Sequence, residues 1–201
     1  MIRHLYICNQ VLQLYRQMKK ISFPIEPADL IATIPNCRMM TYEKFAEINR
    51  CSIQDVVAVC ESKTGCTHYD IANDRYLILW NSSQSDNNVE GRRRWTKAHE
   101  LGHVILNHLS LAAQPMLAEN NLNNLTPTEI ETEADVFAAT LLCPMPIFQM
   151  LDISSPSDIS RVFGLSAEAS ANRWNEYLKW SRYRRKTAWE NDMRRVLIQR
   201  S

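Results

Sequence analysis

Glycine is scarce in this sequence, with only four among 201 residues. Proteins built entirely from β-strands depend on tight turns, and several turn types require glycine. The scarcity therefore argues against an all-β fold. The chain also has no internal repeat and no low-complexity segment, and its length suits one domain, or one domain with a small appendage.

The six cysteines include no Cys-x-x-Cys pair, so a zinc site made of cysteines is not expected. The apolar run at the N-terminus is too short for a signal sequence. No stretch approaches the roughly 18 apolar residues of a membrane span. Reduced thiols in the cytoplasm are the simplest account of the cysteines, so we expect a cytoplasmic protein without a membrane partner.

Charge is distributed unevenly along the chain. The net charge of +1 argues against a molecule built as a whole around polyanion binding. Residues 179–201 contain eight basic and two acidic residues, a balance of +6, which leaves −5 on the remainder. A solvated basic helix is the simplest interpretation, and contact with nucleic acid or an acidic partner is the alternative.

A possible helix-turn-helix lies at Asp158–Tyr177, where two helical patterns flank a glycine-containing turn. DNA binding is therefore one possible function of the C-terminal part. Two helices joined by a short turn are common in any helical domain, however, and we do not expect nucleic acid to be the partner.

The order of predicted elements indicates an α+β protein. We expect extended chain at 37–48, strands at 66–70 and 76–80, and a long helix over about 92–108. A second long helix begins with Thr126 as its N-cap and must end by Cys143 because prolines follow. Further helices complete the chain, so we predict a small mixed or antiparallel sheet packed on the two long helices.

The first long helix carries the sequence His99-Glu100-Leu101-Gly102-His103, an H-E-x-x-H motif. Residues four apart lie one turn apart on the same helix face, so both imidazoles can bind one Zn²⁺. Glu100 then projects beside the metal, where it can take a proton from bound water. The alternative is a pair of partly buried helix histidines with a surface glutamate.

A catalytic zinc ion needs three protein ligands and one open position. His108 is the nearest candidate, but on a continuous helix it lies about 140° around the axis from His103, so we interpret it as structural. The second helix offers Glu129, Glu131 and Glu133. Glu131 is off the face that the other two share, and Glu129 is placed to cap the helix.

Glu133 is the third ligand that we predict. It lies in an apolar stripe, where a carboxylate is costly unless it is paired or bound to a metal. The alternative is a surface acid on an exposed helix. Asp135 could accept a hydrogen bond from a ligand histidine, although a solvent-facing aspartate is equally compatible with the sequence.

The run from Tyr76 to Pro144 resembles the ImmA/IrrE family of metallopeptidases. The matching pieces are a strand ending in Asn81, the run R-R-R-W-T-K-A before H-E-L-G-H, E-A-D-V-F-A-A from Glu133, and L-L-C-P. Members usually show R-x-R-F-T-x-A before the motif, with an apolar residue between T and A, and L-L-M-P at the end. Trp95, Lys97 and Cys143 therefore depart from the pattern. The resemblance implies one zinc ion per chain with His-His-Glu ligation, as in gluzincin-type peptidases, and supports Glu133.

The resemblance also implies a function. It suggests a zinc-dependent endopeptidase that cleaves a helix-turn-helix repressor in a phage, mobile-element or stress-response circuit. The alternative is a zinc-containing regulatory protein that acts by binding, as an anti-repressor or toxin–antitoxin component. We expect the metallopeptidase domain at 1–150, with its motif core at 76–144, and a helical C-terminal segment at 151–201. The strand at 76–80 could receive an extended substrate.

Overall fold

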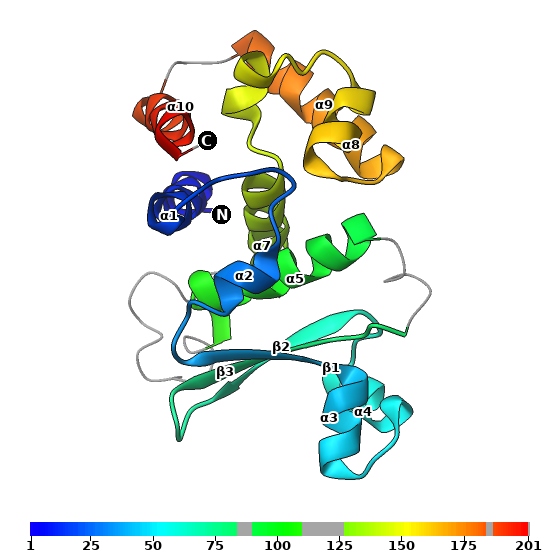
Figure 1. The fold of residues 1–201 in the computed structure, drawn as a ribbon. Helices are drawn as coiled ribbons and strands as arrows, with labels where there is room; N and C mark the ends of the chain where they lie inside the picture. The colour runs from blue at the N-terminus through cyan, green and yellow to red at the C-terminus, as the bar shows by residue number, and fades with distance from the viewer. Residues whose placement is uncertain (84–89, 110–126, 184–186, 201) are drawn as a thin grey trace. The chain divides into compact units, whose positions relative to one another are not determined.

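A computed structural model of the chain is shown in Figure 1. It describes the residues 1–83, 90–109, 127–183 and 187–200. The chain forms two compact units, of which the first contains Met1–Arg3 and Glu26–Ala138, and the second contains His4–Ile25 and Ala139–Ser201. The N-terminal helix thus belongs to the same unit as the C-terminal helices.

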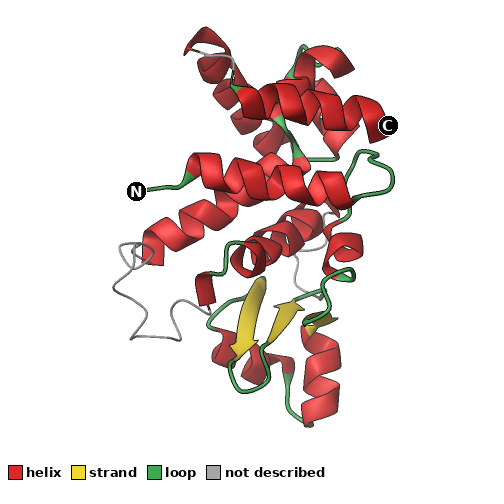
Figure 2. Ribbon diagram, turned by 90° about the vertical axis from the view of Figure 1, so that its left-hand side faces the viewer, coloured by secondary structure: helices red, strands yellow, loops and turns green. Residues whose placement is uncertain are grey.

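The first unit contains a three-stranded sheet, and its strands are yellow in Figure 2. The strands are β1 (Cys37–Thr41), β2 (Gly65–Asp70) and β3 (Arg75–Trp80), in the spatial order β1-β3-β2. Strand β3 pairs in parallel with β1 and antiparallel with β2. The α+β class with a small mixed sheet is thus confirmed, and β3 is its central strand.

The apolar sequence of β3 explains its central place. Ile78 and Leu79 point to opposite faces of the sheet, and both are buried. Leu79 packs in a cluster with residues of α3 (Tyr42–Asn49) and α4 (Ile53–Cys60). Helix α5 (Glu90–Ile105) contacts β2 and β3, and Figure 1 shows it on the other side of the sheet.

Extended chain was expected through residue 48, but the strand ends at Thr41 and helix α3 follows at once. The Thr41 hydroxyl accepts a hydrogen bond of 3.1 Å from the backbone N–H of Lys44. This contact satisfies one of the otherwise unpaired donors of the first helical turn. The threonine is therefore both the last strand residue and the N-cap of the helix.

The two long helices have the predicted positions but not all the predicted ends. Helix α7 (Pro127–Leu142) begins at the expected proline and stops before Pro144, while the expected cap Thr126 lies outside the described residues. Helix α5 stops at Ile105, three residues earlier than predicted. Asn107 then adopts the left-handed conformation, with φ 59°, so His108 is not on the α5 helix.

Helices α5 and α7 approach each other closely at Gly102. A Cβ atom at this position would lie 3.1 Å from Cδ1 of Phe137 and 3.3 Å from Cα of Ala134. Glycine therefore lets the two helices cross with little space between their backbones. This crossing brings the α7 carboxylates near the H-E-x-x-H motif.

The regular elements among the described residues of the second unit are all helices. It comprises α1 (His4–Gln17), the 3₁₀ segment η2 (Met145–Leu151), α8 (Pro156–Phe163), α9 (Ala167–Tyr183) and α10 (Ala188–Arg200). Trp189 of α10 donates a hydrogen bond of 2.7 Å to the carbonyl of Cys8 in α1. Side-chain to backbone bonds of this kind join segments that lie far apart in the sequence.

Helices α8 and α9 form the predicted pair of helices around Gly164, which has φ 64°. Arg173 on α9 is buried, and its Nε donates a bond of 3.0 Å to the carbonyl oxygen of Cys143. Its guanidinium also contacts Glu176 at 2.7 Å. This arginine thus contributes to packing within the unit instead of to an exposed basic surface.

One helical stretch, Thr128–Leu151, is long and apolar enough to cross a membrane by length and composition alone, with a mean hydropathy of 1.5. The sequence analysis did not predict a stretch of this length and hydropathy. Most of its apolar window is buried inside the protein, which is typical of a core helix. Its first half also carries the acidic residues of the candidate site.

Candidate metal centre

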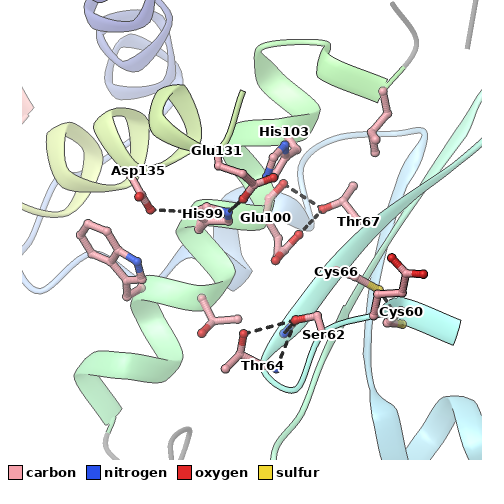
Figure 3. A pocket seen from close by; sticks show the side chains of 15 residues that line it. Cys60, Ser62, Thr64, Cys66, Thr67, His99, Glu100, His103, Glu131 and Asp135 are labelled. Carbon is pink, nitrogen blue, oxygen red and sulfur yellow. Dashed lines mark hydrogen bonds and ion pairs between the residues drawn. The ribbon is translucent and has the colours of Figure 1, made fainter. Parts of the chain in front are cut away.

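The H-E-x-x-H motif lies in the second half of α5, facing a pocket above the sheet (Figure 3). The Nε2 atoms of His99 and His103 are 3.2 Å apart. Both side chains are largely buried, with 17% and 9% of their surface exposed. The helical spacing therefore places two imidazole nitrogens at one point, as the sequence predicts.

Glu131 on α7 completes a group of three possible metal ligands. Its Oε2 lies 3.1 Å from His99 Nε2, and its Oε1 lies 3.6 Å from His103 Nε2. A tetrahedral zinc ion with bonds of about 2.0–2.2 Å keeps its ligand atoms about 3.3 Å from one another. The two imidazoles and the Glu131 carboxylate thus offer one ligand atom each within 4.8 Å of one another, a group that could hold one such ion and leave a coordination position open.

Glu133, the predicted third ligand, is not brought to the two Nε2 atoms. Its side chain is fully buried, and its carboxylate accepts bonds of 2.8 Å from the backbone N–H and 3.0 Å from the Nε of Arg3. His108 Nε2 lies 3.2 Å from the second carboxylate oxygen. The burial of this carboxylate was foreseen from the sequence, but its partners are an arginine and a histidine.

The geometry of α7 explains why Glu131 takes the position expected for Glu133. Residues two apart lie about 200° apart around a helix axis, so the two carboxylates point to opposite sides. Asp135, one turn after Glu131, shares its side and lies 2.9 Å from His99 Nδ1. The spacing Glu-x-x-x-Asp is the sequence signal that could have selected this face.

Hydrogen bonding fixes the orientation of His99. When Asp135 accepts a hydrogen bond from Nδ1–H, the lone pair of a neutral His99 resides on Nε2, which faces Glu131. Burial and the neighbouring imidazoles lower the pKa of His103 to about 3. His103 is therefore neutral near pH 7, as a metal-binding imidazole must be.

Glu100 is buried beside the two histidines and faces strand β2. Its Oε2 accepts a hydrogen bond of 2.7 Å from the hydroxyl of Thr67. Burial raises the pKa of Glu100 to about 7, although the charge of His99 and the Thr67 hydrogen bond act in the opposite direction. A carboxylate with this pKa can both accept and return a proton near neutral pH.

Gly65 on β2 makes room for the catalytic side of α5. A Cβ atom there would lie 2.7 Å from Cγ2 of Thr96 and 3.2 Å from Oε1 of Glu100. It would also lie 3.1 Å from the backbone carbonyl of Leu79. Any larger residue would therefore push strand and helix apart at the carboxylate.

The site opens into a pocket of about 550 Å³. Strand β2 forms one wall with Gly65, Cys66 and Thr67, and the two ligand-bearing helices form the other. The lining combines imidazole, carboxylate and hydroxyl side chains with Trp95 and Leu109, so the pocket presents both polar and apolar contacts beside the motif.

The sequence matches the family model of peptidase M78, described as the IrrE N-terminal-like domain, over residues 51–175. The match covers more than half of the chain and includes α5 and α7. The chain belongs to the M78 family. No curated protein matches it.

Membership of the M78 family confirms the resemblance to ImmA/IrrE metallopeptidases and identifies the chain as a metallopeptidase, a hydrolase. The M78 match contains His99, Glu100, His103 and Glu131, the residues that the structure gathers at the pocket. Sequence reasoning missed Glu131 as part of this group. It also missed the contact of Thr67 with the motif glutamate, which no local pattern on β2 signals.

Proposed function

We propose that this M78 peptidase is a zinc-dependent endopeptidase with one zinc ion per chain. His99, His103 and Glu131 would hold the ion, and Glu100 would act as the general base. The observation that carries the proposal is the grouping of two imidazole nitrogens, 3.2 Å apart, with the Glu131 carboxylate, one oxygen of which lies 3.1 Å from His99 and the other 3.6 Å from His103. The buried carboxylate of Glu100 lies beside this group. Two imidazole nitrogens and one carboxylate oxygen are a typical ligand set of catalytic zinc.

In the proposed reaction, Glu100 transfers the proton and Thr67 orients the Glu100 carboxylate. Zinc, when bound, polarises the water nucleophile and the peptide carbonyl. Glu100 takes the proton of the attacking water and passes it to the amine that leaves. Thr67 engages Oε2 of this carboxylate, so Oε1 is the oxygen that would receive the proton.

An extended substrate would bind along β2 and not along β3. From the sequence, β3 was expected to bind the substrate. However, β3 is paired on both sides and has no free edge. Among the described strands, β2 is an edge of the sheet, and it lines the pocket. An added peptide strand would pass its backbone beside Glu100 and the two histidines.

The substrate that we propose is a helix-turn-helix transcriptional repressor in a phage, mobile-element or stress-response circuit. The basis is the ImmA/IrrE resemblance, together with the proposed binding of an extended segment along β2. A cytoplasmic location belongs to this proposal, and it rests on the expectation from the sequence that the cysteines are reduced. The competing function is regulation by binding alone, as an anti-repressor or a toxin–antitoxin component.

The decisive experiment compares wild type with Glu100→Gln against a panel of such repressors. Glutamine keeps the size of the side chain and cannot accept the proton. We expect wild type to cut a repressor at one position and the variant to leave it intact while still binding zinc. Relief of repression by both proteins, without cleavage, would instead establish the binding function.

The ligand assignment needs its own test. We expect wild type to hold about one zinc ion per chain after purification with the metal, and Glu131→Ala to bind it much more weakly. The measurement is metal content together with a chelator competition. Unchanged affinity in Glu131→Ala would remove this residue from the ligand set.

A further inference from the structure

A series of hydrogen-bonded groups leads from His103 away from the pocket. His103 Nδ1 lies 3.1 Å from Nδ1 of His108. Nε2 of His108 lies 3.2 Å from Oε2 of Glu133. Both His108 and Glu133 are buried, with 1% and 0% of their side-chain surface exposed. The series therefore runs through the interior of the first unit.

Only one arrangement of protons satisfies this series when His103 offers Nε2 to a metal. Nδ1 of His103 must then carry a proton, and this N–H donates a hydrogen bond to Nδ1 of His108. His108 in turn carries its own proton on Nε2, and this N–H donates a hydrogen bond to Glu133. Each neighbour thus fixes the tautomer of the next, and the carboxylate ends the series.

In both histidines of the motif, Nδ1 is linked by hydrogen bonds to a carboxylate. Nδ1 of His99 meets the carboxylate of Asp135 directly, at 2.9 Å. Nδ1 of His103 reaches the carboxylate of Glu133 through one intervening imidazole. A metal-binding histidine commonly donates its second N–H to a carboxylate or carbonyl, which holds the ring in one orientation.

The turn after α5 places His108 in this series. Asn107 has φ 59°, and the hydroxyl of Tyr76 on β3 donates a bond of 2.8 Å to its side-chain oxygen. The backbone leaves the helical path at Asn107, and His108 then lies beside His103. A continuous helix would have directed this side chain elsewhere.

Arg3 holds the far end of the series. Its backbone N–H and its guanidinium together make four hydrogen bonds to the Glu133 carboxylate. Burial raises the pKa of Glu133, but these bonds outweigh burial and the net shift is downward. The Glu133 carboxylate is thus fully buried yet paired with a partly exposed arginine, and removing one partner of such a pair is costly.

We propose that His108 and Glu133 are positioning residues for metal binding, which hold His103 in the tautomer and orientation that present Nε2 to the ion. Arg3 fixes Glu133 in turn. The inference rests on the proposed metal centre. It assigns Glu133 to the support of a ligand instead of to the metal itself.

The test measures zinc affinity of the full-length apoprotein by competition with a chromophoric chelator, and its melting temperature without metal. We expect His108→Phe to bind zinc about 10- to 100-fold more weakly, which is typical when a supporting partner of a ligand is removed. His108→Gln should recover most of the affinity, because its amide can accept from His103 and donate to Glu133. A purely structural role would lower the melting temperature of both variants without this recovery.

Two further variants complete the experiment. His68→Phe makes the same replacement at an exposed histidine on β2, and its zinc affinity should equal that of wild type. Arg3→Met combined with Glu133→Leu removes the buried charge pair without leaving one charge unpaired, so it answers the question even when His108→Phe does not fold. We expect weaker zinc binding in this double variant too.

Zinc affinity within twofold of wild type in His108→Phe or in the double variant would overturn the positioning role and leave the metal centre intact. Wild-type protein that binds no zinc would overturn both the metal centre and the positioning role. Loss of affinity with recovery in His108→Gln would support both.

Discussion

At the scale of single residues, the site depends on which atoms face one another more than on which residue types are present. Glu131 and Glu133 are chemically identical and two positions apart, yet one faces two imidazoles and the other faces Arg3. The sequence predicts the H-E-x-x-H face because the spacing fixes it. It did not predict the face of α7, since that depends on how α7 rotates against α5.

Glu100→Gln should lower peptide hydrolysis by about 10²- to 10⁴-fold, the usual contribution of a general base. Zinc content should not change, because Glu100 is not among the three grouped donors. Single-turnover cleavage of a repressor, or of a peptide library if no repressor is known, gives the rate. A variant that keeps more than a tenth of the wild-type rate would exclude Glu100 as the base.

Gly65→Ala should destabilise the protein by about 1–3 kcal/mol, since overpacking costs this much in a tight interior. The added methyl group would lie 2.7 Å from Cγ2 of Thr96. Urea denaturation measures the loss. The double variant Gly65→Ala/Thr96→Ser removes that methyl contact and should regain part of the stability; no regain would place the strain elsewhere.

At the scale of elements, the sequence predicts what is encoded locally. The apolar run of β3 and the prolines around α7 mark those elements without tertiary information. The end of α5 was not predictable in this way, because Asn107 is held by Tyr76, which is distant in the sequence. The start of α3 at Thr41 was readable from a capping residue, but the apolar pattern suggested continued extension.

The turn at Asn107 offers a test of the element boundary. Asn107→Gly and Asn107→Val both remove the bond to Tyr76, but only valine is strained at φ 59°. We expect the valine variant to be less stable than the glycine variant by about 1–2 kcal/mol. Thermal denaturation compares them, and equal stabilities would show that the left-handed turn is not essential.

At the scale of the whole molecule, the two units differ in construction: one combines sheet and helices, and the other is helical in its described parts. Neither could be delimited from the sequence, because α1 belongs with helices that follow it by more than a hundred residues. Contacts such as Trp189 with Cys8 produce this grouping. No local sequence pattern indicates which distant helix a given helix will pack against.

Thiol reactivity should report the folded state of both units. Cys51 is exposed, whereas Cys37 and Cys143 are buried. Burial raises the pKa of Cys37 to about 11 and of Cys143 to about 12, so little thiolate forms at pH 8. Iodoacetamide followed by mass spectrometry should modify Cys51 first, and the other two after unfolding. Rapid modification of Cys143 in the native protein would contradict its burial.

Metal removal should lower the stability of the first unit. His99 and Glu131 are 32 residues apart in the sequence and lie on different helices, so an ion bound by both would join α5 to α7. Zinc at 100 times its dissociation constant would stabilise the fold by about 2.7 kcal/mol. A chelator should therefore reduce the melting temperature of wild type but not of Glu131→Ala, and an equal reduction in both would argue against this bridge.

The bridge between the two helices has a consequence for the protein in the cell. An apoprotein that unfolds more often is degraded more often, because proteases act on its open state. The amount of this peptidase would then rise and fall with the supply of zinc. A cell short of the metal would lose the enzyme itself as well as its activity.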